Sequence, residues 1–87
     1  MKPEIQENIF WGYKPKNNGS YCNINMDTGM INYVSPESPV APNSWIKGYK
    51  ISEAMKKYFQ LDDMVKDTIN EFAKYNIDLF NRFINEL

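Results

Sequence analysis

Apolar and polar residues alternate along the first part of the chain, with a period of two. Residues 9–14 (IFWGYK) place Ile9, Trp11 and Tyr13 on one side and the intervening residues on the other. This alternation is the pattern of a half-buried β-strand. The turn-rich stretch 15–19 (PKNNG) that follows is expected to end the strand.

Two further alternating runs, 20–26 (SYCNINM) and 30–34 (MINYV), flank the short loop 27–29 (DTG) and predict a β-hairpin. We expect Met26 to pair with Ile31, because a shift by one residue would put polar side chains on the apolar face. The expected apolar face holds Cys22, Ile24, Met26, Ile31 and Tyr33. The expected opposite face holds Asn23, Asn25 and Asn32, with Met30 and Val34.

A proline-rich stretch, 35–44 (SPESPVAPNS), follows the hairpin, with prolines at every third position. Ligands of SH3-type domains share this spacing, but a basic residue usually anchors them and the charged neighbour here is Glu37. We therefore interpret the stretch as a polyproline-II strap that carries the chain roughly 30 Å across one edge of the sheet. Residues 45–51 (WIKGYKI) alternate again and predict a fourth strand, with an extended loop as the alternative.

The C-terminal part changes to helical periodicity. Ser52 is a candidate N-cap for an amphipathic helix over 53–61, and Asp62 for a second helix that runs to about Glu86. The apolar face of the first helix would hold Ala54, Met55, Tyr58, Phe59 and Leu61. The apolar face of the second would hold Val65, Ile69, Phe72, Leu79, Phe80, Phe83, Ile84 and Leu87.

These elements predict an α+β fold in one small domain of 87 residues. A small antiparallel meander of three or four strands is followed by two C-terminal helices, of which the last is long and amphipathic. Residues 1–8 form a lead-in, 9–51 the sheet with its strap over 35–44, and 52–87 the helical part. Aromatic residues make up 15% of the chain, which favours an ordered core in spite of the short length.

Net charge and targeting signals limit the classes of function that we expect for the chain. The net charge of −1 does not support a strongly basic nucleic-acid surface. Neither a signal peptide nor an apolar run of membrane-spanning length is evident, and one cysteine cannot form an intramolecular disulfide. We therefore expect a cytoplasmic protein that makes no membrane contact.

The residues that usually carry catalysis are scarce. The chain has no histidine, which excludes Ser-His-Asp triads, Cys-His pairs and histidine-ligated metals. The alternating strand around Cys22 indicates a core thiol rather than a nucleophile. Asp63, Asp67 and Glu71 follow one helix face, which we interpret as a solvated surface. We expect no enzymatic activity, no cofactor and no metal. A small enzyme that works through carboxylates alone is the third hypothesis, and it would lose activity on substitution of Asp63 or Asp67 without loss of fold.

By elimination, the leading hypothesis is a small protein–protein binding module. Its expected contact residues are aromatic and lysine side chains around the predicted strands: Trp11, Tyr13, Trp45, Lys47, Tyr49 and Lys50. The chain has eleven Asn, nine Ile and nine Lys but one Arg and three Ala, a bias typical of AT-rich genomes. This composition leads us to a narrower hypothesis of a phage or mobile-element protein that inhibits a host enzyme or defence complex by occupying its surface.

Two alternative interactions remain. The same rings, with Lys14 and Lys16, could form a weak single-stranded nucleic-acid surface. A homodimer is the other alternative, because heptad-like spacings run along the last predicted helix. The candidate seam is Phe72, Asn76, Leu79 and Phe83. Packing of this helix on the sheet, with Asn76 bonded locally or marking a bend, would explain the same pattern without a dimer.

Overall fold

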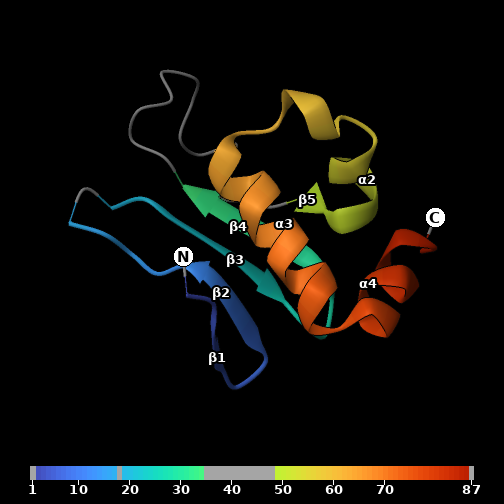
Figure 1. Cartoon of the computed structure of the whole chain (residues 1–87), viewed down its shortest axis with the longest axis horizontal. Helices are drawn as coiled ribbons and strands as arrows, with labels where there is room; N and C mark the ends of the chain where they lie inside the picture. The colour runs from blue at the N-terminus through green and yellow to red at the C-terminus, as the bar shows by residue number, and fades with distance from the viewer. Residues whose placement is uncertain (1, 18, 35–48, 87) are drawn as a thin grey trace.

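The computed structural model describes residues 2–17, 19–34 and 49–86. Five antiparallel strands form one sheet in the order in which they occur along the chain, and helical segments follow them (Figure 1). The strands are β1 (Glu4–Gln6), β2 (Ile9–Tyr13), β3 (Tyr21–Asn25), β4 (Met30–Val34) and β5 (Tyr49–Lys50). The helical segments are α2 (Ile51–Met55), the 3₁₀ turn η1 (Tyr58–Gln60), α3 (Asp63–Tyr75) and α4 (Ile77–Ile84).

The helices lie on one face of the sheet, with α3 across its middle strands (Figure 1). Side chains from the sheet and from all three α-helices meet in a single core. The buried apolar residues are Phe10, Cys22, Ile24, Ile31, Tyr33, Ile51, Ala54, Val65, Ile69, Phe72 and Phe83. The structure thus confirms the α+β class, with an antiparallel sheet followed by C-terminal helices.

The sheet has five strands, whereas three or four were expected. Glu4–Gln6, assigned to the lead-in, pairs with β2 so that Ile5 lies opposite Phe10. All three residues of β1 are exposed, so this edge strand lacks the apolar alternation that reveals a half-buried strand. The strap over 35–44 and most of the predicted strand 45–51 lie outside the described residues. Within that run, Tyr49–Lys50 forms β5, and Ile51 already belongs to α2.

A β-bulge at Gly12 changes which side chains of β2 share a face. Trp11 lies opposite Asn23, whereas Tyr13 lies opposite Cys22, so one extra residue stands between them. Trp11 and Tyr13 therefore point to opposite faces of the sheet, and the predicted shared side was wrong. Gly12 is buried under α3, where an added Cβ would lie 2.6 Å from Cγ2 of Thr68.

The hairpin pairs in a register two residues away from the expected one. Cys22 lies opposite Tyr33, and Ile24 lies opposite Ile31. A shift of two residues keeps every side chain on its face, so the predicted apolar face is correct although the pairing was wrong. Asn25 lengthens the loop, because its Oδ1 accepts hydrogen bonds from the backbone N–H groups of Asp27 (2.8 Å) and Thr28 (3.2 Å).

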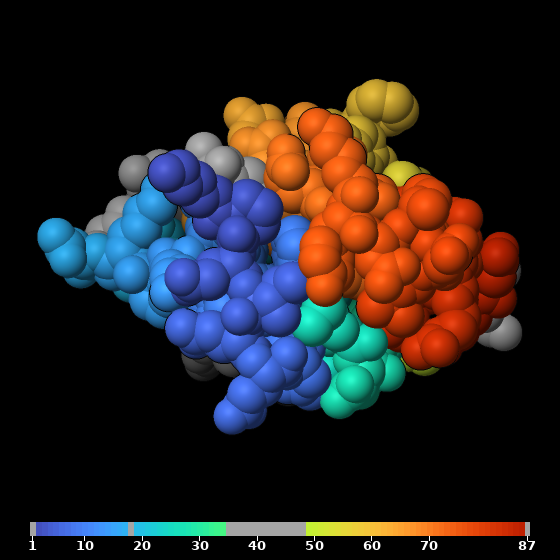
Figure 2. Space-filling model, turned by 60° about the horizontal axis from the view of Figure 1, so that its bottom comes forward, coloured from blue at the N-terminus to red at the C-terminus, as the bar shows by residue number. Residues whose placement is uncertain are grey.

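The loop closes on Gly29, whose φ of +74° lies in the left-handed region that favours glycine. An added Cβ at Gly29 would also lie 2.7 Å from Cγ of Phe83, so the turn and α4 are in close contact. Figure 2 shows this turn in teal beside the orange-red surface of the C-terminal helices.

The first helix begins and ends earlier than expected. Its N-cap is Lys50, which makes no side-chain capping bond, and Ser52 is a buried residue of the first turn. The predicted cap at Ser52 was therefore wrong. The helix ends at Met55, so Tyr58–Gln60 forms a separate turn. Asp62 caps α3 as predicted, with Oδ1 accepting from the N–H of Met64 at 3.0 Å.

The long last helix of the prediction is two helices that meet at Asn76. The backbone of Asn76 leaves the helical region, with φ −150° and ψ 87°. Its Oδ1 accepts from the N–H of Leu79 at 3.0 Å and so caps α4. The break lets α4 fold back, and the rings of Phe72 and Phe83 stack with centroids 6.4 Å apart.

Candidate functional site

The structure separates the aromatic residues that were expected to form one contact surface. Trp11 lies on the sheet face away from the helices, where its ring meets that of Tyr21 at 5.9 Å. Tyr13 lies on the helix side, and its hydroxyl donates to Asp67 at 2.8 Å. Tyr49 lies on β5, and β3 and β4 separate it from the strand of Tyr13, a distance of about 14 Å at ordinary strand spacing.

The lysines of the expected contact surface and of the nucleic-acid alternative, which adds Lys14 and Lys16, are likewise dispersed. Lys14 forms an ion pair with Glu4 on the edge strand, and the Nζ of Lys16 lies 5.2 Å from the ring centroid of Tyr13. Lys50 is exposed beside Tyr49. Trp45 and Lys47 lie outside the described residues. The described members therefore do not form one continuous groove of rings and lysines.

Most residues of the candidate dimer seam make contacts within their own chain. Phe72 is fully buried and Phe83 is 3% exposed, and both belong to the core. Asn76 caps α4, and Leu79 is half-buried. The four residues lie on two helices rather than on one stripe, so the heptad-like spacing reflects packing inside the domain.

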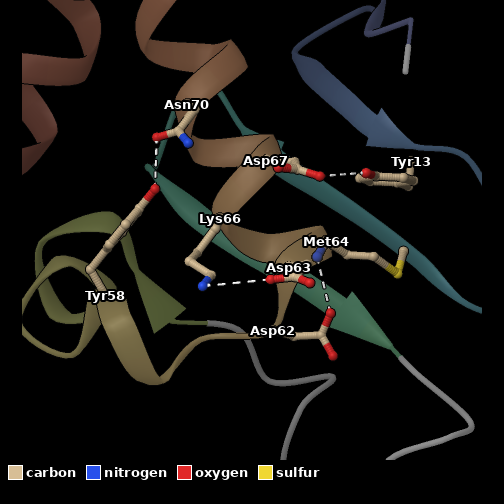
Figure 3. Close-up of polar contacts among 8 residues, drawn as sticks. All are labelled: Tyr13, Tyr58, Asp62, Asp63, Met64, Lys66, Asp67 and Asn70. Carbon is tan, nitrogen blue, oxygen red and sulfur yellow. Dashed lines mark hydrogen bonds and ion pairs between the residues drawn. The ribbon is translucent and has the colours of Figure 1, made fainter.

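The predicted carboxylate face is a surface on which each carboxylate has a neighbouring donor. Asp63 lies 3.5 Å from Lys66, Glu71 lies 3.6 Å from Lys74, and Asp67 accepts the hydrogen bond of Tyr13. Asp63 and Asp67 are both exposed, and Figure 3 shows Asp67 directed towards Tyr13 and Asp63 towards Lys66. Among the described residues, no three Cys, Asp or Glu side chains come together as metal ligands would.

Cys22 is a core residue, as predicted, and is fully buried. Burial raises the pKa of its thiol from 9.0 to about 12. The thiolate is the nucleophilic form of cysteine, so this thiol stays in its unreactive, protonated form at neutral pH.

A cavity of about 200 Å³ lies between the sheet edge formed by β4 and β5 and the segment that joins α2 to α3. Its described lining residues are Ile31, Tyr33, Tyr49, Ala54, Lys57, Gln60, Leu61, Asp62 and Val65. The buried residues Ile31, Ala54 and Val65 make an apolar interior. Exposed charged and polar residues, Lys57, Gln60 and Asp62, stand at the rim.

Phe59 stands next to this rim and is the most exposed large apolar side chain in the described part of the chain, at 92%. It is the middle residue of η1, and the next three residues along the chain all line the cavity. In Figure 2, the gold part of the chain around residue 60 projects from the upper surface. The cavity and the projecting ring are thus adjacent features of one surface, which we call the Phe59 surface: Lys57, Phe59, Gln60, Leu61, Asp62 and the cavity.

Bonds on both sides hold η1 in place. The N–H of Gln60 donates to the carbonyl of Lys57 at 2.9 Å, and the N–H of Leu61 donates to that of Tyr58 at 3.1 Å. The Tyr58 hydroxyl reaches back to α3 and donates to Oδ1 of Asn70 at 3.0 Å (Figure 3). The ring of Phe59 packs edge-on against the ring of Tyr58, with centroids 5.5 Å apart. Phe59 nevertheless remains 92% exposed, so this contact leaves most of its ring open to a partner.

Both signs of charge occur at the rim. The Nζ of Lys57 lies 4.5 Å from the ring centroid of Tyr49, which orients the ammonium group beside the cavity. Asp62 is exposed, and only its Oδ1 is used in capping α3. A partner could therefore meet a cation and an anion next to the apolar interior.

Sequence reasoning missed this surface because it placed Phe59 on the apolar face of a continuous helix over 53–61. One signal did point to a break. An N-cap residue has extended backbone angles, so the predicted cap at Asp62 required the preceding helix to end before it. Leu61 is indeed extended, with φ −76° and ψ 152°.

Comparisons with protein-family models, with curated proteins and with solved structures gave no significant match. None of the helices in the described ranges has the length and apolar content required to cross a bilayer.

Proposed function

We propose that the chain is a non-enzymatic protein-binding module whose contact region is the Phe59 surface. The observation that carries this proposal is the 92% exposure of Phe59 immediately beside an apolar cavity. A single exposed ring is not unusual by itself, but a ring beside an apolar cavity is the arrangement in which aromatic residues form the energetic centre of an interface. The proposal keeps the predicted class of function and moves the site away from Trp11, Tyr13 and Tyr49.

The size of the cavity favours a protein partner over a cofactor. Sites for drug-sized molecules and cofactors usually enclose about 300–1,000 Å³, and this cavity holds about 200 Å³. A volume of this size suits a single apolar side chain, as in interfaces where an anchor residue of one protein fills a pocket of the other.

The rigidity of η1 adds to the expected affinity. Burying a phenylalanine side chain that was exposed contributes about 1.5–3 kcal/mol before the costs of association. Immobilising flexible groups reduces this gain. The bonds of Tyr58 and Asp62 already hold the turn, so little further ordering is required when Phe59 is buried.

The narrower role of a phage or mobile-element inhibitor of a host protein remains a prediction from composition. The proposal from the geometry concerns protein binding alone. A nucleic-acid surface remains a prediction as well, and no contact among the described residues favours it, since Trp11 and Tyr13 lie on opposite faces.

The proposal is tested by replacing Phe59 with a photo-crosslinking amino acid and capturing partners from an extract of the organism that encodes the chain. Competition with unlabelled wild-type protein should abolish capture, and competition with Phe59→Ala should not. Ile77→Ala is the matched control. Ile77 is a 54%-exposed apolar residue just beyond the C-terminal end of α3, whereas η1 lies just before its N-terminal end.

We expect Phe59→Ala to fold normally, because substitutions of exposed side chains usually change the free energy of unfolding by about 0.5 kcal/mol or less. A thermal melt of the variant confirms this before the competition. Equal competition by wild type and Phe59→Ala would refute the proposal.

A further inference from the structure

We infer that a second copy of this chain fits the Phe59 surface, so that two copies form a symmetric dimer in which each Phe59 enters the cavity of the other. The inference rests on the proposed function, because it names the partner for that same surface.

One short segment carries both the projecting ring and part of the rim of the cavity. Phe59 projects from η1, and Lys57, Gln60, Leu61 and Asp62 line the cavity. A two-fold dimer uses the same patch on both copies, so a residue that projects and the hole that receives it must both belong to that patch. If the ring and the cavity lay on opposite sides of the molecule, successive copies would instead assemble into an open-ended filament.

The charges at the rim of the cavity are complementary to those of a second copy. The rim carries one cation, Lys57, and one anion, Asp62, five residues apart. When a two-fold axis passes between two such rims, Lys57 of each copy can face Asp62 of the other. Both charges then gain a partner of opposite sign, and the second carboxylate oxygen of Asp62 remains available because capping uses Oδ1 alone.

The area available for the interface indicates how strong the dimer should be. The chain exposes 5549 Å², and a standard interface covers about 800 Å² of each partner, about a seventh of this surface. The Phe59 surface is one turn and one small cavity, so we expect an interface at the small end of the range. Such contacts are transient, and the dimer should therefore dissociate at micromolar rather than nanomolar concentration.

Sedimentation of the full chain from micromolar to millimolar concentration tests the inference. We expect the wild type to rise from 10.3 kDa towards twice that mass, and Ile77→Ala to do the same. Phe59→Ala removes the ring, and Gln60→Trp fills the mouth of the cavity from an exposed position. Each variant should weaken self-association by about 30-fold or more, the factor that corresponds to a loss of about 2 kcal/mol at an interface centre.

Mixing the two variants provides the sharpest readout. Phe59→Ala keeps the cavity, and Gln60→Trp keeps the ring, so together they retain one of the two reciprocal contacts. The mixture should form a heterodimer under conditions in which each variant alone sediments as a monomer. Lys57→Glu should also weaken the wild-type dimer, since it places an anion opposite Asp62.

Different results overturn different claims. A wild-type chain that stays at 10.3 kDa at millimolar concentration overturns the inference. If the photo-crosslinked Phe59 surface then still captures another protein, the proposed function stands and the occupant is a foreign partner. A dimer that persists in folded Phe59→Ala, or two variants that never associate on mixing, would show that self-association uses another surface and would also overturn the inference.

Discussion

The hydroxyl of Tyr13 on β2 donates a hydrogen bond of 2.8 Å to Oδ2 of Asp67 on α3, a residue 54 positions further along the chain (Figure 3). The bulge at Gly12 makes this bond possible, because without the extra residue Tyr13 would point to the other face of the sheet. The bond therefore links strand and helix at the exposed margin of their contact.

This contact predicts a loss of stability at alkaline pH. Partial burial, followed by the hydrogen bond to Asp67, raises the pKa of Tyr13 from 10.0 to about 12, and Asp63 adds a smaller electrostatic contribution. Below pH 10 the phenol is protonated in both the folded and the unfolded chain, so its full contribution is present. Between pH 10 and pH 12 the unfolded chain ionises first, and the contribution is lost.

Urea unfolding of the wild type and Tyr13→Phe across this pH range measures the effect. At neutral pH the variant should lose about 0.5–1.5 kcal/mol with its hydrogen bond, and the difference between the two proteins should shrink above pH 10. Cys22, whose buried thiol also has a pKa raised to about 12, is present in both proteins and itself adds a smaller electrostatic contribution to the raised pKa of Tyr13. A constant difference up to pH 12 would contradict this explanation.

Gly12 allows α3 to approach the sheet, and we expect Gly12→Ala to be destabilising. The new methyl group would clash with Oγ1 of Thr68 and would lie 2.6 Å from its Cγ2 and 2.7 Å from its Cβ. Thr68 is fully buried, and its hydroxyl donates to the carbonyl of Met64 at 2.7 Å, so it cannot move aside freely. Overpacking of this kind costs about 1–3 kcal/mol.

Chemical denaturation of Gly12→Ala, Thr68→Ala and the double variant checks the cause. Because Thr68→Ala removes two of the three crowding atoms, the double variant should be less destabilised than the sum of the two single variants. Strict additivity would mean that the cost arises elsewhere.

The cap at Asn76 predicts how the helix break responds to substitution. Asn76→Ala removes the acceptor for the N–H of Leu79 and should lower the free energy of unfolding by about 1 kcal/mol. Asn76→Asp keeps an acceptor at the same position and should stay close to the wild type. If thermal melts show the two variants to be equally destabilised, the role of Asn76 is not capping.

Cys22 predicts slow thiol chemistry in the folded protein. The side chain is fully buried, and burial raises the pKa of the thiol to about 12. A chromogenic thiol reagent at neutral pH should therefore react only as fast as the protein opens, and at once in denaturant. Gly12→Ala should accelerate labelling by the factor by which it raises the population of open molecules, about tenfold for each 1.4 kcal/mol of destabilisation. Labelling of the native wild type at the rate of a free cysteine would contradict the buried position.

The sequence-based predictions were correct where the period of the apolar residues is sufficient to assign a side chain to one face of an element. The alternation in β3 and β4 correctly assigned Ile24 and Ile31 to the buried face, although the pairing was wrong by two residues. A shift of two preserves the face, so the apolar pattern cannot distinguish these registers. The Asn25 side chain decides the register by bonding into the loop.

The candidate site could not be derived in the same way. Phe59 fits the apolar spacing of a helix over 53–61, and only the early end of α2 exposes it. Trp11 and Tyr13 fit one side of a regular strand, and only the bulge separates them. In both places a short stretch of irregular backbone redirects a side chain, one extra residue in β2 and a 3₁₀ turn after α2, and irregular backbone leaves no periodic signal.

The sequence by itself determined the α+β class, the apolar face of the hairpin, the buried thiol of Cys22 and the cap at Asp62, because these depend on local periodicity and on the chemistry of single residues. Tertiary structure alone decided the pairing of β1, the return of α4 onto α3 and the exposure of Phe59. Each of these depends on contacts between distant segments: β1 is stabilised by pairing with β2, Phe72 stacks on Phe83 only if α4 folds back, and Tyr58 holds η1 through Asn70. Contacts of this kind arise from the packing of the whole chain, and the spacing of residues along it does not encode them.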